Sequence, residues 1–328
     1  MWGVILGASI LTWTLCFPVR RILVRLGFWD VANDRSCHAG RIIRGGGLAP
    51  TLVILLSVGL WVNSTAPQIG YVWVACLILL ALINVTDDFR GLPIKVRLAG
   101  QLLVAVVSAW AIRSGDWGII EIAGVALLLM TLMNFFNFLD GINGLIPTQV
   151  VVITLGLILL GGNLNANEGI MACVIGGAAL GFLPFNFPRA SMFLGDVGSV
   201  MFGYSCGMLL LWHGGGFNGV GVWVWLLTAF IFFEGFIAIF RRMWNGEQWW
   251  TPHREHFYQR LVRSGWSHSQ TVGLISCGQG IILLGLVLRE PLELSPTFLG
   301  FMTICIWGMY GCFVENQFRN YHDEVGSK

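Results

Sequence analysis

The sequence predicts an all-α, polytopic integral membrane protein with about 11 transmembrane helices. Of its 328 residues, 56% are hydrophobic and 11% are charged, and that charged share is less than half of the ~25% typical of soluble domains. Apolar runs of about 20 residues, the length that crosses a bilayer as a helix, recur along the whole chain. Lysine and arginine gather in alternate connections, as in membrane proteins of fixed orientation. We therefore expect residues 1–328 to form a single transmembrane domain.

The apolar runs justify each expected span in order along the chain. The first run has no charge before it and is followed by Arg20 and Arg21, which predicts a retained span and not a cleaved signal peptide. The spans are expected at about 2–19, 47–63, 69–86, 98–113, 117–135, 146–162, 168–186, 198–213, 219–240, 270–288 and 296–314.

The basic residues predict the orientation, because they accumulate on the cytoplasmic side. With an external N-terminus, all but two of the 19 lysines and arginines, Arg113 and Arg289, fall in cytoplasmic segments. The C-terminus is then cytoplasmic as well. The net charge of +2 reflects this topology, and we expect a lipid bilayer and no nucleic acid as partner. The expected cytoplasmic segments are about 20–45, 87–97, 136–146, 187–197, 241–269 and 315–328.

Polar clusters at successive exits on this one face predict a single convergent site. In a transporter, by contrast, the functional polar groups lie near the midplane of the membrane. In chain order, the clusters are Arg44 before Gly45-Gly46-Gly47; Asp87 and Asp88, with Arg97 beyond; Asn134, Asn137 and Asp140; Asn186 and Asp196; and His253 and His256.

The acids in these clusters suit a divalent cation. Asp87 and Asp88 end an apolar run, and a carboxylate costs much less at the edge of a bilayer than at its centre. Asp196 lies beside two glycines and a hydroxyl in Gly195-Asp-Val-Gly-Ser199, which suits a cation bridged to phosphate oxygens. The simpler alternatives are a helix that ends in solvated charge and a plain glycine turn.

The amides, histidines and glycines suit an anionic ligand. Asn134, Asn137 and Asp140 are spaced by three and share one helix face, although amides at a helix end also act as caps. His253 and His256 lie beside arginines and fit phosphate better than Mg²⁺, which prefers oxygen ligands; solvated loop histidines are the alternative. The glycines after Arg44 are compatible with a phosphate nest.

The combination resembles the polyprenyl-phosphate N-acetylhexosamine-1-phosphate transferases over about residues 34–260. The histidine segment is more similar to the WecA- and WbpL-type branch, which initiates O-antigen, than to the phospho-MurNAc-pentapeptide translocase. Asn143 departs from the pattern, because many members carry an aspartate there that contacts the nucleobase. The matching segments are Asp87-Asp88 with Gly91-Leu92, Arg97 to Gln101, Asn137 to Gly144, Phe193 to Ser199 and His253-Arg-Glu-His256.

The resemblance implies an enzyme of the bacterial inner membrane, with one transmembrane catalytic domain and a cytoplasmic-face active site. It would transfer N-acetylhexosamine-1-phosphate from a UDP-N-acetylhexosamine to undecaprenyl phosphate and release UMP, initiating O-antigen or another surface polysaccharide. The implied cofactor is Mg²⁺, with Mn²⁺ as a substitute, and a homodimer is compatible with the family. The implied catalytic residues are Asp87, Asp88, Asp196, His253 and His256, with Asp87, Asp88 and Asp196 as metal ligands; the implied substrate-binding residues are Arg44, Arg97, Asn137, Asp140, Asn143, Asn186 and Phe193.

Two alternatives compete with this function. A transporter or flippase for polyprenyl-linked or nucleotide sugars predicts acids near the centres of spans, whereas here they stand at the ends. A family member with the peptidoglycan precursor as donor predicts a triple-histidine loop, which His253-Arg-Glu-His256 does not match.

Overall fold

The computed structural model describes residues 1–31, 40–65, 67–113, 117–160, 166–213, 221–248 and 254–326, and these ranges are mostly helical. Within the described residues, ten of the 11 expected spans each coincide with one helix. Seven helices in the described ranges are long and apolar enough to cross a membrane, so the polytopic class is confirmed, while the number of about 11 spans stays a prediction. The helices that match one expected span each are α1 (Trp2–Arg25), α2 (Leu48–Thr65), α3 (Pro67–Arg90), α4 (Ile94–Ile112), α5 (Ile119–Leu139), α6 (Leu145–Leu160), α7 (Ala166–Asn186), α8 (Gly195–His213), α12 (His268–Val287) and α13 (Pro296–Gly326).

The structure differs from the predicted elements in the ninth run and in the connections. The run at 219–240 is broken into α9 (Gly221–Val224), the 3₁₀ turn η1 (Trp225–Thr228) and α10 (Ala229–Trp244). The last long connection contains α11 (Phe257–Arg263). The prediction of an all-α fold was incomplete, because β1 (Trp29–Val31) and β2 (Arg41–Ile43) pair antiparallel in the first connection, with Trp29 opposite Ile43. Hydropathy alone does not register elements this short.

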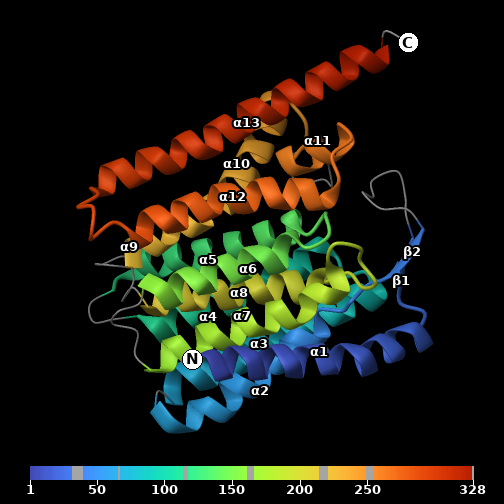
Figure 1. The fold of residues 1–328 in the computed structure, drawn as a ribbon. Coiled ribbons are helices and arrows are strands. Elements are labelled where there is room, and N and C mark those ends of the chain that lie inside the picture. The colour runs from blue at the N-terminus through green and yellow to red at the C-terminus, as the bar shows by residue number, and fades with distance from the viewer. Residues whose placement is uncertain are drawn as a thin grey trace.

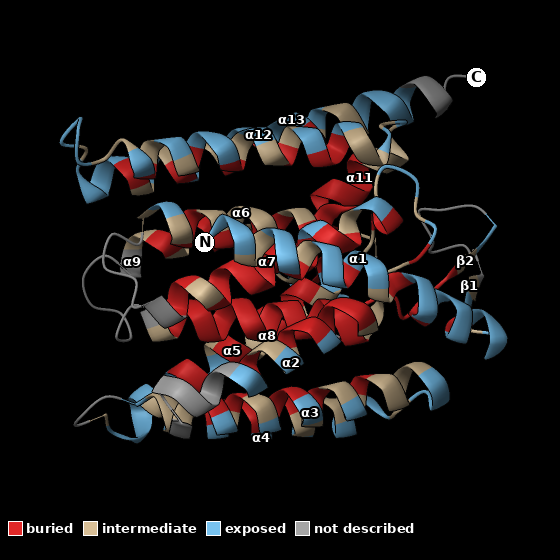
Figure 2. Ribbon diagram, turned by 60° about the horizontal axis from the view of Figure 1, so that its bottom comes forward, coloured by how far each residue is buried: buried red, intermediate tan, exposed pale blue. Residues whose placement is uncertain are grey.

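The helices form a bundle with α7 and α8 at its centre (Figures 1 and 2). Both are mostly buried, whereas α3, α4, α12 and α13 expose one side (Figure 2). That exposed surface includes large apolar side chains such as Leu102, Ile304 and Met309. An apolar outer surface around a packed interior is expected of helices that contact lipid tails, which are as apolar as leucine.

Small residues let the outer helix α1 approach the central helix α7 closely. A Cβ atom on Gly177 would lie 2.6 Å from the carbonyl oxygen of Ile5, and one on Gly181 would overlap the carbonyl oxygen of Ser9. Glycines spaced by four on one helix face permit this backbone contact in membrane bundles.

The helix ends that carry the polar clusters all lie at the same end of the bundle. In Figure 1 this is the end where α1 leads into β1 and β2 and where α11 packs. Side-chain hydrogen bonds join the ends of α3, α5 and α7 to the starts of α4 and α8 and to Gly144 there. The alternation of spans in the sequence therefore predicted correctly which connections come together.

Candidate active site

Arg97 connects two of the predicted acids across three helices. Its Nη1 lies 2.7 Å from Oδ2 of Asp87, at the end of α3, and 3.1 Å from Oδ2 of Asp196, in the first turn of α8. The other oxygen of Asp87 accepts the backbone N–H of Leu92 at 2.6 Å. One guanidinium on α4 thus neutralises carboxylates that lie about a hundred residues apart in the sequence.

Asp88 faces a second cation. Arg44 Nη2 lies 3.1 Å from Asp88 Oδ1 and donates to the Asp88 carbonyl oxygen at 2.6 Å. The Arg44 guanidinium also lies over the ring of Phe28, 5.5 Å from its centroid. Asp88 Oδ2 is buried and has no hydrogen-bond partner among the described residues. A buried, unpaired carboxylate oxygen is costly, and it is available to a ligand.

The glycines after Arg44 form packing contacts and not a phosphate nest. The N–H groups of Gly46 and Gly47 donate to the carbonyl oxygens of Phe193 and Leu194 at 2.9 and 2.8 Å. These two donors are therefore occupied, which argues against the nest interpretation. The contacts hold the segment that follows Arg44 against the segment that leads into Asp196.

Gly195 lets the turn that carries Asp196 approach Gly45 and Asp88 closely. It adopts a positive φ of 73°, which glycine tolerates without strain. A Cβ atom there would lie 3.0 Å from the backbone nitrogen of Gly45 and 3.5 Å from Asp88 Oδ2. The loop therefore sets Asp196 beside Asp88.

Asn137 and Asp140 bring the end of α5 to the same cluster. Asn137 Nδ2 donates to Ser199 Oγ at 3.4 Å, and Asn137 also contacts Asp196. Burial and the negative charge of Asp196 raise the pKa of Asp140 well above its usual value, although the Gly195 N–H acts in the opposite direction. Burial likewise raises the pKa of Asp196, against the lowering effect of Asn137 and Arg97. Asn134 points elsewhere and donates to Gln101 Oε1 at 2.8 Å.

Asn186 and Asn143 lie beside this cluster in a loop that is held by backbone contacts. Asn186 is buried; its Oδ1 accepts the N–H of Gly144 at 2.7 Å and its Nδ2 donates to the carbonyl oxygen of Met192 at 3.0 Å. Asn186 therefore links the backbone at Gly144 to the backbone at Met192. Asn143 Nδ2 donates to the carbonyl oxygen of Pro188 at 3.2 Å. Phe193 is half-buried, and its backbone N–H donates to Ile43 at 2.7 Å.

His256 lies beside Glu234, a buried carboxylate that is not among the site residues expected from the sequence. Its Nδ1 lies 3.7 Å from Oε2 of Glu234, and both side chains are buried. His253 lies outside the described residues. The signal that could have identified Glu234 is an ionisable residue inside an apolar run, which indicates a functional residue by default.

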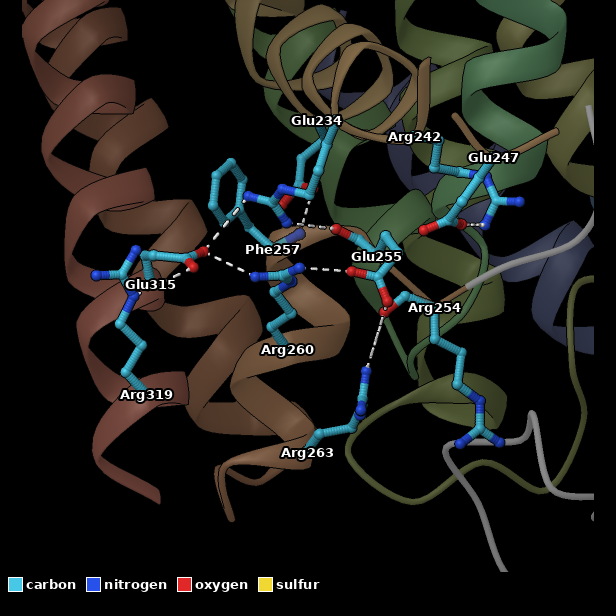
Figure 3. Close-up of polar contacts among 11 residues, drawn as sticks. Glu234, Arg242, Glu247, Arg254, Glu255, Phe257, Arg260, Arg263, Glu315 and Arg319 are labelled. Carbon is cyan, nitrogen blue, oxygen red and sulfur yellow. Dashed lines mark hydrogen bonds and ion pairs between the residues drawn. The ribbon is translucent and has the colours of Figure 1, made fainter. Parts of the chain in front are cut away.

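An ion network joins Glu255, Arg260 and Glu315 beside Phe257, the residue that follows His256 (Figure 3). Glu315 of α13 lies 2.8 Å from Arg260 and 3.4 Å from Arg241, and Arg260 also pairs with Glu255. Burial acts to raise the pKa of Glu255, but its hydrogen bond to Arg260 and nearby arginine charges lower the pKa overall. Arg260, one of the arginines that lie near the two histidines in the sequence, therefore pairs with glutamates in the structure.

The acid cluster fits a cation that is bound mainly through substrate. Asp88, Asp140 and Asp196 repel one another, and the buried oxygen of Asp88 lacks a partner among the residues described. No three His, Cys, Asp or Glu side chains within the described ranges are arranged as a complete metal site. Mg²⁺ typically binds through one or two carboxylates together with waters and substrate phosphates, so this donor set fits that ion.

Known proteins that this chain is similar to are transferases. Residues 71–214 match the family described as Glycosyl transferase family 4. The chain is 29% identical to the decaprenyl-phosphate N-acetylglucosaminephosphotransferase of Mycobacterium tuberculosis, over 91% of this chain and 85% of that protein. It is 23% identical to the undecaprenyl-phosphate alpha-N-acetylglucosaminyl 1-phosphate transferase of Escherichia coli K12, over 96% of this chain and 91% of that protein. The similarity thus extends over nearly the full length of both relatives.

Proposed function

We propose that this chain, whose residues 71–214 match glycosyl transferase family 4, is a member of that family and transfers N-acetylglucosamine-1-phosphate from UDP-N-acetylglucosamine to undecaprenyl phosphate. The products are an undecaprenyl-diphosphate sugar and UMP, and the reaction initiates a cell-envelope polysaccharide such as O-antigen. The names of the relatives support N-acetylglucosamine as the donor sugar. The matching family and the named relatives are transferases, which argues against the transporter alternative.

The observation that carries this proposal is the meeting of Asp87, Asp88 and Asp196 with Arg44 and Arg97 at one end of the bundle. Transfer to a phosphate acceptor requires two anions to approach each other, and positive charge must neutralise them. Sugar-centred chemistry instead uses paired carboxylates that flank the anomeric carbon. The two arginines beside the acids favour reaction at phosphorus.

In the proposed reaction, an oxygen of the acceptor phosphate attacks the β-phosphorus of the donor. A new P–O bond forms while the bond from the β-phosphorus to the bridging oxygen breaks, and UMP leaves with that electron pair. A phosphate monoester has a second pKa of about 6, so the acceptor is mostly a dianion at neutral pH. A strong general base is therefore not needed, and Asp87 serves to orient Arg97 toward the acceptor.

We assign the remaining residues from the family resemblance, except Asn186, which is assigned by its neighbours. Asn137 and Asp140 contact the nucleotide part of the donor, Asn143 and Phe193 its uracil, and His253 and His256 its diphosphate. Asn186 supports the loop instead of touching substrate, since both ends of its amide are occupied by backbone. Asp196 and Asp88 would hold Mg²⁺, which when bound neutralises phosphate oxygens and polarises the β-phosphorus.

We further propose about 11 membrane spans, with this site on the cytoplasmic face of the bacterial inner membrane. The arginines at the same end as the site support that orientation, because basic residues mark the cytoplasmic side. Cys37 is expected on the cytoplasmic face and Asp116 and Asn165 on the external face; all three lie outside the described residues.

The decisive experiment follows the bond that breaks. Purified protein, undecaprenyl phosphate, Mg²⁺ and donor labelled at the β-phosphorus should give label in the lipid fraction together with the sugar, and UMP as the nucleotide product. Added UMP should drive the reaction backwards, because one phosphoanhydride is exchanged for another. Release of labelled UDP with unlabelled lipid would refute the proposal. Omitting the acceptor is the control, and a panel of UDP-sugars tests the donor.

A further inference from the structure

Glu234 is a buried carboxylate that the proposed reaction does not use. It lies on α10 between aromatic residues, and its side chain is fully buried. An ionised carboxylate in such a place is strongly destabilising unless donors surround it. Its two oxygens are accordingly occupied, and the identity of the donors indicates its role.

All of these donors come from the start of α11 and from α13. Oε2 accepts the N–H of Phe257 at 2.9 Å, and Oε1 accepts the N–H of Tyr258 and the O–H of Tyr310, each at 3.0 Å. Nδ1 of His256 lies 3.7 Å from Oε2. Glu234 thus contacts three consecutive residues, His256 to Tyr258, and fixes the point where the histidine segment enters α11.

Tyr258, the last of these three residues, touches the acid-bearing end of α5. The Tyr258 O–H donates to the carbonyl oxygen of Phe138 at 3.0 Å. A Cβ atom on Gly141 would overlap that hydroxyl, so the two segments are in direct contact beside Asp140. The His256 ring stacks on the Tyr258 ring, with centroids 5.5 Å apart. A continuous set of contacts therefore runs from Glu234 through His256 and Tyr258 to the end of α5.

We propose that Glu234 is a positioning residue that holds His256 and the first turn of α11 at a fixed place beside the end of α5. The hydrogen bonds that Glu234 accepts from Phe257 and Tyr258 fix the backbone next to His256, and with it the position of the imidazole. This inference rests on the proposed function, because it takes His256 as the group that meets the donor diphosphate. Glu234 itself does not touch substrate.

Two substitutions separate charge from geometry. Glu234→Gln keeps the size of the side chain and one acceptor but removes the charge beside His256. Glu234→Asp keeps the charge and withdraws it from the N–H groups of Phe257 and Tyr258. Each should lower kcat by at least about tenfold, since misplacement of a reacting group by about 1 Å costs up to 10²-fold. The donor KM should change by less than about threefold, because most donor contacts lie elsewhere.

A double-mutant cycle with His256→Gln tests whether Glu234 acts through the histidine. Residues that act as one unit are not additive. In the His256→Gln background, either Glu234 substitution should therefore reduce kcat by no more than about twofold further. Ser108→Ala is the control for destabilisation alone: it removes a buried hydrogen bond to Tyr204 on α8, and should lower the melting temperature with kcat unchanged.

The possible results distinguish a wrong role for Glu234 from a wrong proposed function. Multiplied effects in the double variants, or unchanged kcat in both single variants, would overturn the role of Glu234. Failure of both variants to fold in detergent would also overturn it, because Glu234 would then be a requirement of the fold. If the wild-type protein itself formed no UMP, the proposed function would be wrong, whereas an active wild type with an uncoupled cycle refutes only the positioning role.

Discussion

Gly47→Ala is the sharpest test of the way the fold positions Asp196. A Cβ atom on Gly47 would lie 2.5 Å from the backbone nitrogen of Gly198 and 2.7 Å from the carbonyl oxygen of Leu194, and closer still to the Gly198 Cα. Atoms pack at about 3.5–4.0 Å. The starts of α2 and α8 would therefore have to separate by about 1 Å, and both neighbours are backbone, which cannot rotate out of the way.

The magnitude follows from this overlap. Overpacking typically costs about 1–3 kcal/mol, and a rigid backbone neighbour places Gly47→Ala near ~3 kcal/mol. At about 2–4 °C per kcal/mol for a large domain, the melting temperature should fall by roughly 6–12 °C. The displaced segment carries Asp196, and a shift of about 1 Å in a reacting group costs up to 10²-fold in rate. We expect kcat to fall by one to two orders of magnitude.

The assay has a matched control on the same helix. Gly59 lies in the interior of α2, and a Cβ atom there would meet nothing within 4 Å. Gly59→Ala should stabilise the helix by about 0.5–1 kcal/mol and leave kcat unchanged. Melting in detergent and UMP release should be measured for both variants. Wild-type stability and activity in Gly47→Ala would refute the close contact between α2 and α8, and with it the placement of Asp196.

Three further predictions concern the cluster itself. Asp196→Asn keeps the shape of the side chain and removes its charge, so it should abolish UMP release in a protein that still melts cooperatively; near-normal activity with normal Mg²⁺ dependence would remove Asp196 as a metal ligand. Asp88→Asn should raise the Mg²⁺ concentration for half-maximal activity more than Asp87→Asn does, because Asp87 has both oxygens occupied; equal Mg²⁺ titrations would contradict this. His256→Gln should lower kcat without changing the Mg²⁺ titration, and a large shift there would place His256 near the metal.

The sequence by itself determined the class of the protein and the identity of its chemical groups. Hydropathy is a property of consecutive residues, so the helices and their order followed from apolar runs of membrane length. The alternation of basic residues fixed which connections share one end, and that grouping brought Arg97 and Asp196 into a single cluster. The family motifs supplied the reaction to expect.

Only the tertiary structure decided which partner each side chain meets. Asn186 and the glycines after Arg44 have the residue types of a ligand site, but the packing of α2, α7 and α8 engages them with backbone. Glu234 stood alone in an apolar run, and its partners lie 22 to 76 residues away along the chain. A carboxylate takes its role from the donors that folding brings near it, and the sequence pattern around it does not contain that information.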